Sequence, residues 1–194
     1  MRHALIFGDS IAMGHNAPNM EGWAHHLKKF WEERDPAVTV INVARDGAKT
    51  TDVLSHLESD CEKYRPDEVV LAIGLNDSAY SFAGHQSSIP REKFEQNIEQ
   101  ILTIVEKHAK KIIIIGIGRV NEVHSTFSDE NNVVYQYQNI VIQKFNDSLS
   151  GIAATRKAVF VPIYDLLSDD ELDDGTHPTA KGHQKLFEAI KKVL

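Results

Sequence analysis

Two short segments, far apart in the chain, carry side chains that could perform acyl transfer. Ser10 follows an apolar run that ends at Gly8-Asp9, and its hydroxyl could act as a nucleophile. Late in the chain, Asp174 and His177 are three residues apart with a glycine between them. That spacing allows the carboxylate to fold back onto an imidazole N–H, which would fix the tautomer of a histidine base. Folding needs neither residue at these positions, so this pair is the most specific chemical signal in the sequence.

Two further segments could supply hydrogen-bond donors for a developing oxyanion. Gly47, in Arg45-Asp46-Gly47-Ala48, can adopt a positive φ and let a ligand approach the backbone closely. Asn76, in Gly74-Leu75-Asn76-Asp77, could direct its side-chain N–H₂ into the same crevice. The backbone N–H of Ser10 would be a third donor, because it would lie near a helix N-terminus, where the dipole favours negative charge.

Each segment also has a purely local explanation. Serine and aspartate are common helix N-caps, glycine and asparagine are common in turns, and the turn at Asp174–His177 could simply begin a helix. Together, the segments provide a nucleophile, a base with its orienting acid, and oxyanion donors, which is the set that acyl transfer requires. The sequence therefore predicts Ser10, Asp174 and His177 as catalytic residues. It predicts an oxyanion hole formed by Ser10, Gly47 and Asn76.

These segments need a scaffold that brings them to one edge. Short apolar runs, mostly rich in β-branched residues, predict strands at Ala4–Phe7, Val38–Val43, Val69–Ile73, Ile112–Ile117 and Ala158–Ile163. Most of these runs do not alternate with polar residues, which is typical of strands buried on both faces and hence of a parallel sheet. Ligands bind beyond the carboxyl ends of such strands. Ser10, Gly47 and Asn76 each follow a predicted strand, so we expect them at that edge.

Segments with a helical spacing of apolar residues separate the strands. The apolar stripes are Trp23/Leu27/Phe30/Trp31, Val53/Leu54/Leu57, Phe94/Ile98/Ile101/Leu102/Val105, Val134/Tyr137/Val141/Phe145 and Leu186/Phe187/Ile190/Leu194. The alternation of strand and helix predicts a single three-layer α/β domain over residues 1–194, with a mainly parallel sheet. The longest irregular stretch, Gly118 to Asn132, is predicted to be a loop that lines the acyl or alcohol side of the site.

Composition and charge narrow the possible partners. The 194 residues carry a formal net charge of −7 and no Lys/Arg cluster beyond scattered pairs, so we expect neither nucleic acid nor an anionic membrane surface as a partner. No apolar stretch is long enough for membrane insertion, and the first strand begins by about residue 3, which leaves no room for a secretory leader. The single cysteine, Cys61, cannot form an internal disulfide, so we expect a reducing, cytoplasmic compartment.

The sequence predicts neither a metal nor a cofactor. The ten histidines include no His-Glu-x-x-His motif, and a P-loop is absent. Gly116-Ile117-Gly118 lacks the third glycine of a dinucleotide fingerprint, because position 121 is Asn. Cys61 has acidic neighbours that would raise the pKa of its thiol, which makes it a poor candidate nucleophile.

The set Gly8-Asp9-Ser10, Gly47, Gly74-Leu75-Asn76-Asp77 and Asp174-Gly175-Thr176-His177-Pro178 resembles the SGNH hydrolases, also called the GDSL lipase/esterase family. The order and approximate spacing agree over nearly the whole chain, and the family's four letters match Ser10, Gly47, Asn76 and His177. The first motif departs from the family at one place, where GDSL becomes Gly-Asp-Ser-Ile, a change that the family's pattern tolerates. The resemblance implies a flavodoxin-like three-layer sandwich with a five-stranded parallel sheet.

The leading functional hypothesis is a serine esterase that acts on a small-molecule ester with a small or medium acyl chain, through an acyl-enzyme on Ser10. A carbohydrate O-deacetylase, a lysophospholipase and a thioesterase remain open alternatives within the same family, because fold does not choose among them. A different class, a non-catalytic flavodoxin-like binding module, is less favoured, since no member of the catalytic or oxyanion set is missing. The sequence predicts no oligomeric state.

Overall fold

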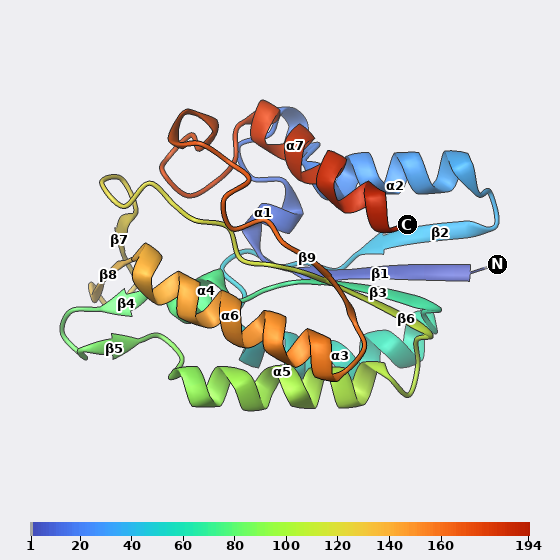
Figure 1. The fold of residues 1–194 in the computed structure, drawn as a ribbon, viewed down its shortest axis with the longest axis horizontal. Coiled ribbons are helices and arrows are strands. Elements are labelled where there is room, and N and C mark those ends of the chain that lie inside the picture. The colour runs from blue at the N-terminus through green and yellow to red at the C-terminus, as the bar shows by residue number, and fades with distance from the viewer. Residues whose placement is uncertain (1) are drawn as a thin grey trace.

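A five-stranded parallel sheet forms the centre of the computed structural model, which describes residues 2–194 (Figure 1). Its strands are β1 (Arg2–Gly8), β2 (Val38–Asn42), β3 (Glu68–Ala72), β6 (Lys111–Ile115) and β9 (Val159–Val161). They lie in the order β2-β1-β3-β6-β9, and every neighbouring pair is parallel. Among these five strands, that is the spatial order 2-1-3-4-5 of flavodoxin-like folds. The prediction of a flavodoxin-like five-stranded parallel sheet is therefore confirmed.

Helices cover both faces of this sheet and complete the three layers (Figure 1). One face carries α2 (Trp23–Arg34) and α7 (Ala180–Ile190), and the other carries α3 (Thr50–Tyr64), α5 (Arg91–Val105) and α6 (Asn139–Thr155). The remaining helices are short: α1 (Ser10–Met13), η1 (Pro18–Met20), α4 (Leu75–Ser78), η2 (Asp169–Glu171) and η3 (Lys191–Val193). None of the helices within residues 2–194 is both long and apolar enough to cross a membrane.

The apolar residues of the strands divide between two hydrophobic clusters. In β1, Leu5 and Phe7 face α3, α5 and α6, whereas Ala4 and Ile6 face α2 and α7. All four side chains are fully buried, which explains why the run does not alternate with polar residues. Burying each large apolar side chain contributes about 1.5–3 kcal/mol, so the two clusters together fix the sheet that positions the site.

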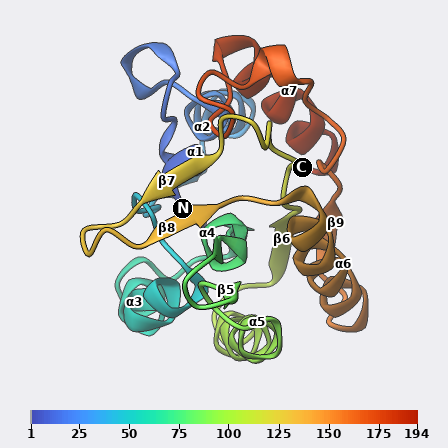
Figure 2. The same cartoon turned by 90° about the vertical axis from the view of Figure 1, so that its left-hand side faces the viewer.

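A second, antiparallel sheet lies at the carboxyl ends of the main strands (Figure 2). It consists of β4 (Tyr80–Ser81), β5 (Gln86–Ser87), β7 (Thr126–Ser128) and β8 (Val134–Gln136), in the order β5-β4-β8-β7. The sequence predicted neither this sheet nor its strands. Figure 2 shows β7 and β8 running across the end of the molecule where α1 and α4 begin.

The β7–β8 hairpin corrects two expectations. The fourth apolar stripe predicted a helix that included Val134 and Tyr137, but the helix begins only at Asn139. Val134 is exposed and pairs with Ser128, because the β-branched and aromatic residues of this segment favour a strand. Likewise, the predicted irregular loop from Gly118 to Asn132 contains β7. A turn anchored by Asp129, whose carboxylate accepts from the backbone N–H of Val133 at 2.9 Å, joins the two strands.

Candidate active site

Ser10 lies at the carboxyl end of β1, as the first residue of α1. Asp9 caps this short helix, and its side chain accepts a hydrogen bond from the backbone N–H of Ile11 at 3.0 Å. Gly8 makes the tight turn possible, because a Cβ there would lie 2.5 Å from the Cβ of Ala12. The strand-to-helix turn therefore holds the Ser10 hydroxyl at the edge of the sheet.

The structure brings Ser10, His177 and Asp174 together in one hydrogen-bonded chain. The Ser10 Oγ lies 2.9 Å from Nε2 of His177, and Nδ1 of His177 lies 2.7 Å from Oδ2 of Asp174. The carboxylate oxygen accepts the Nδ1 proton, so Nε2 is left as the acceptor for the serine hydroxyl. Burial acts to raise the pKa of Asp174, but hydrogen bonds from His177 and Thr176 outweigh it and lower that pKa. Asp174 is thus an anion that orients the imidazole.

Asp174 and His177 lie on a tight loop before α7. The turn requires Gly175, which has a φ of +84°, and the backbone N–H of Asn121 donates to its carbonyl at 2.8 Å. An isolated bridge between Leu172 and Pro178 closes the base of the loop. These contacts hold the loop in one shape before any substrate binds.

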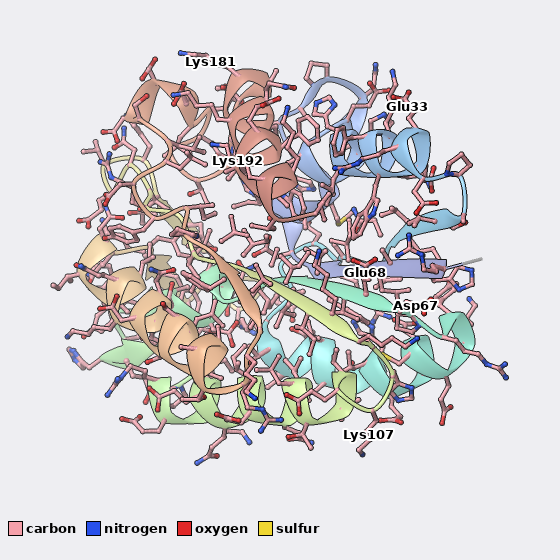
Figure 3. All side chains as sticks on the ribbon, turned by 45° about the vertical axis from the view of Figure 1, so that its right-hand side comes forward. Glu33, Asp67, Glu68, Lys107, Lys181 and Lys192 are labelled. Atoms are coloured by element: carbon pink, nitrogen blue, oxygen red, sulfur yellow. The ribbon has the colours of Figure 1, made fainter. Side chains whose placement is uncertain are left out.

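A buried acid anchors the same loop to α7. The Glu171 side chain has no exposed surface and lies 3.0 Å from Nζ of Lys181 and 2.7 Å from Nζ of Lys185. Hydrogen bonds from Lys185 and Lys181 lower the pKa of Glu171 to about 2. Lys181 projects outward beside the first turn of α7 (Figure 3). This ion-paired cluster fixes the distance between α7 and the Asp174–His177 loop.

The backbone offers two donors near the serine. Gly47 is exposed, has a φ of +64°, and follows β2, which is the neighbour of β1 in the sheet. Within residues 2–194, neither the N–H of Gly47 nor that of Ser10 has a hydrogen-bond partner. Ser10 lies just after β1 and Gly47 lies in the loop after β2, so both free N–H groups belong to neighbouring loops at the carboxyl edge of the sheet, and both could donate to an oxyanion.

Asn76 follows β3 and lies on the first turn of α4. Its Nδ2 donates to the carbonyl of Ala48 at 3.0 Å, which ties it to the loop of Gly47. Its Oδ1 accepts a hydrogen bond from the hydroxyl of Tyr137 at 2.6 Å. The two contacts leave the second Nδ2 proton without an acceptor among residues 2–194, so it can serve a ligand.

Sequence reasoning missed two residues beside this set, Tyr137 and His15. Tyr137 was assigned to an apolar helix stripe, and no motif marks its contact with Asn76. The ring of His15 lies 5.2 Å from that of His177, and its Nε2 lies 3.8 Å from Oδ1 of Asp46. No sequence signal distinguishes His15 from the other histidines, because its position follows from the chain's path after α1.

Burial perturbs two carboxyl groups close to the site. It raises the pKa of Asp9 to about 6, and hydrogen bonds from Ile11 and the charge of His177 only partly oppose it. Burial likewise raises the pKa of Asp77 to about 6, against hydrogen bonds from Thr50. Both groups lie next to a candidate site residue in the chain, so their protonation belongs to the electrostatics of the site.

An apolar cavity of about 60 Å³ adjoins the candidate residues. Residues on both sides of the serine and the histidine contribute to its wall, among them Ile11, Thr176 and Pro178. The rest of the wall is mostly apolar and comes from the carboxyl ends of β3 and β6, from the segment after β9, and from α1, α2 and α7. Of the loop that was predicted to line the site, Gly118, Arg119 and Val120 line this cavity, whereas Val123 is 82% exposed.

No group of three or more His, Cys, Asp or Glu side chains within the described residues is arranged to hold a metal ion. Cys61 is buried in α3, and its thiol pKa is raised to about 11, chiefly by burial and further by the charges of Glu58 and Asp60. The thiol is therefore protonated and lies outside the site.

A serine, a histidine and an aspartate in hydrogen-bond contact at the carboxyl edge of a flavodoxin-like sheet are typical of serine hydrolases. Residues 6–185 match the GDSL-like Lipase/Acylhydrolase family, and the chain belongs to that family. It is an ester-hydrolysing enzyme.

Known relatives are similar over almost their whole length. The chain is 22% identical to an arylesterase of Vibrio mimicus over 98% of this chain and 86% of the relative. A lipase/acylhydrolase from Enterococcus faecalis has a similar structure, with a TM-score of 0.78 and 24% identity over 100% of this chain and 95% of that one. A variant of an acetyl xylan esterase from Geobacillus stearothermophilus gives a TM-score of 0.76 and 18% identity, over 98% and 93% of the two chains.

Proposed function

We propose that this protein is a serine esterase that hydrolyses small or medium-chain acyl esters through an acyl-enzyme on Ser10. The observation that carries the proposal is the continuous hydrogen-bonded chain from the Ser10 hydroxyl through His177 to Asp174. We further propose that residues 1–194 act as one hydrolase domain, which the continuous main sheet supports.

In the proposed mechanism, Nε2 of His177 takes the proton of Ser10 while Oγ attacks the ester carbonyl carbon. Asp174 stabilises the resulting imidazolium. The negative oxygen binds the N–H groups of Ser10 and Gly47 and the side chain of Asn76. As the bond to the alcohol breaks, His177 returns the proton to the leaving oxygen. A water molecule then attacks the acyl-enzyme by the same proton transfers and releases the acid.

The apolar cavity supports the short end of the acyl range. The tetrahedral carbon directs one substituent to the oxyanion donors and another to His177, so the acyl chain must leave in a third direction. In the sheet, β2 and β3 lie on opposite sides of β1, the strand that leads to Ser10. Gly47 follows β2, whereas residues at or just after the ends of β3, β6 and β9 line the cavity, so the cavity and Gly47 lie on opposite sides of Ser10. The cavity volume of about 60 Å³ is small, which favours a short acyl chain.

A carbohydrate O-deacetylase is the second candidate. The polar side chains of His15 and Asp46 beside His177 offer hydrogen-bonding groups to an alcohol rich in hydroxyls. The cavity also accepts an acetyl group easily. The small volume of the cavity favours these short acyl groups over the long acyl chain of a lysophospholipase or of a fatty thioester.

Hydrolysis of p-nitrophenyl esters from acetate to decanoate tests the proposal. We expect the wild type to turn over the short esters and Ser10→Ala to be inactive on all of them. The matched control is Ser59→Ala, because Ser59 lies on α3 and, within residues 2–194, its hydroxyl hydrogen-bonds only to the carbonyl of His56 in the same helix. This control variant should retain wild-type rates.

A fluorophosphonate probe separates the remaining outcomes. Labelling of the wild type but not of Ser10→Ala shows a reactive serine, even where no p-nitrophenyl ester is cleaved, and acetylated sugars are then the substrates to test. A wild type that neither hydrolyses esters nor reacts with the probe refutes the esterase and favours the non-catalytic binding module.

A further inference from the structure

An asparagine side chain that donates to an oxyanion must keep its amide in one orientation. The terminal torsion of asparagine is broad, and a flip exchanges oxygen and nitrogen in nearly the same space. If Asn76 flipped, its oxygen would face the developing negative charge and would repel it. The chain must therefore fix this amide before the reaction.

Two contacts at opposite ends of the amide do so. The carbonyl of Ala48 can only accept, so its 3.0 Å contact requires the nitrogen of Asn76 on that side. This single contact would still leave the amide plane free to swing. The hydroxyl of Tyr137 donates to Oδ1 at 2.6 Å and holds the other end.

Tyr137 is itself held firmly at the end of β8. Its side chain is buried, and its ring packs against Phe127 with 5.1 Å between ring centroids. Its backbone exchanges hydrogen bonds with Ser125, from N–H to carbonyl at 3.2 Å and from the serine hydroxyl at 2.9 Å. Burial, aided by the charge of Asp9, raises the pKa of the phenol, so the hydroxyl stays protonated and remains a donor.

We propose that Tyr137 is a positioning residue, whose hydroxyl holds the amide of Asn76 so that its free N–H points to the reacting oxygen. The small antiparallel sheet thereby acquires a role, since it carries this hydroxyl to the edge of the main sheet. The inference rests on the proposed esterase function, because it takes Asn76 as an oxyanion donor.

The Tyr137→Phe variant tests this role, because it removes the hydroxyl and keeps the ring. A donor that acts on the transition state affects turnover more than ground-state binding. We expect kcat for p-nitrophenyl acetate to fall roughly 3- to 10-fold, the factor that one hydrogen bond supports, with KM within about twofold of the wild type.

Tyr135→Phe is the matched control. Tyr135 lies two residues earlier, within β8, and its ring stacks on the same Phe127 with 5.6 Å between centroids. Its hydroxyl makes no hydrogen bond within residues 2–194. This variant should keep the wild-type kcat, whereas an equal loss in both variants would show a general effect of the hairpin and would overturn the proposal.

A double variant separates positioning from a structural role. Asn76→Ala should lower kcat by about 10²–10³. If Tyr137 acts only through Asn76, then adding Tyr137→Phe to that variant costs nothing more. The same fold loss in both backgrounds, or a change confined to KM, would mean that Tyr137 acts elsewhere, and the proposal would fail.

A readout independent of activity completes the test. The side-chain N–H₂ signals of Asn76 in a ¹H–¹⁵N spectrum can be assigned by their loss in Asn76→Ala. We expect Tyr137→Phe to shift or broaden them and Tyr135→Phe to leave them in place. Unmoved signals in Tyr137→Phe refute the positioning role. An inactive, unlabelled wild type would instead refute the esterase function, and these signals would still decide the role of Tyr137.

Discussion

The carboxylate of Asp77 accepts hydrogen bonds from both the backbone N–H and the hydroxyl of Thr50, at 3.1 and 2.5 Å. Thr50 begins α3 shortly after Gly47, and Asp77 directly follows Asn76. The contact therefore ties together the two loops that carry candidate oxyanion donors from different strands. Asp77 is a fully buried acid, and its hydrogen bonds to Thr50 set the distance between the two loops.

Replacing Asp77 with alanine should loosen this connection. The variant leaves the N–H and hydroxyl of Thr50 without their acceptor in a buried place, which costs about 1–3 kcal/mol for each group. We expect a lower free energy of unfolding in urea and a kcat for p-nitrophenyl acetate reduced by at least about tenfold, because the donors lose their spacing. Asp77→Asn keeps one acceptor oxygen, so its losses in the free energy of unfolding and in kcat should be smaller. A wild-type kcat in Asp77→Ala would show that the contact between Asp77 and Thr50 does not determine the spacing of the oxyanion donors.

The raised pKa of Asp9 predicts an unusual pH dependence of stability. Its value of about 6 in the folded protein exceeds the ordinary 3.8, so the folded state takes up this proton first as the pH falls. The contribution of Asp9 to stability therefore increases as the pH falls from about 6 to about 4. Above pH 6, the buried charge is destabilising.

The Asp9→Asn variant isolates this contribution, because it keeps an acceptor for the N–H of Ile11 and cannot ionise. We expect it to be more stable than the wild type at pH 7, by an amount on the order of 1–3 kcal/mol. The difference should shrink toward zero by pH 4. Urea unfolding of both proteins from pH 4 to 7 measures it, and a difference that is constant with pH would contradict the prediction.

The contribution of Glu171 to stability should have the opposite pH dependence to that of Asp9. Its pKa is lowered from 4.5 to about 2, so its stabilising contribution is complete above pH 4.5 and is lost as the pH falls from there toward 2. Glu171→Gln should lower the free energy of unfolding at pH 7 by about 1–3 kcal/mol, a figure reduced for solvent screening because the side chains of both lysines are exposed. The acid sensitivity between pH 4.5 and 2 should weaken in the variant.

The control for this prediction is Glu188→Gln, on the helix α7 that also carries Lys181 and Lys185. Glu188 pairs with Lys191 at the surface, and such exposed pairs contribute little. We therefore expect the free energy of unfolding of this variant to stay close to that of the wild type. If both variants lose the same stability, burial of Glu171 has no special effect.

Gly118→Val should shorten the acyl chains that the enzyme accepts. Gly118 lines the apolar cavity, and a Cβ there would make an ordinary contact, 3.8 Å from Cδ1 of Ile163, so the two methyl groups of a valine would occupy space at the cavity wall. We expect kcat/KM for butyrate and longer esters to fall by about tenfold or more relative to acetate. Gly151→Val is the control, because a Cβ at this exposed helix position meets nothing within 4 Å. If kcat/KM depends on acyl chain length in the same way in Gly118→Val as in the wild type, the acyl group does not bind in this cavity.

The sequence by itself determined the main sheet and the candidate set. Uninterrupted apolar runs such as Ala4–Phe7 can be buried only on both faces of a sheet, and this dictates a parallel α/β fold. The motifs around Ser10, Gly47, Asn76 and His177 could be recognised because each combines a chemical group with local turn chemistry. The hydrogen bond between Asp174 and His177 was also predictable, since it joins residues three positions apart.

Only the tertiary structure decided what lies around this set. The contact of Tyr137 with Asn76 spans 61 positions, and the segment of Tyr137 reads as a helix or as a strand from its apolar residues alone. Pairing with β7 selected the strand and moved the start of α6 to Asn139. The pairing of Asp77 with Thr50 and the approach of His15 to His177 likewise depend on how distant segments pack, because their partners are adjacent in space and not in the chain.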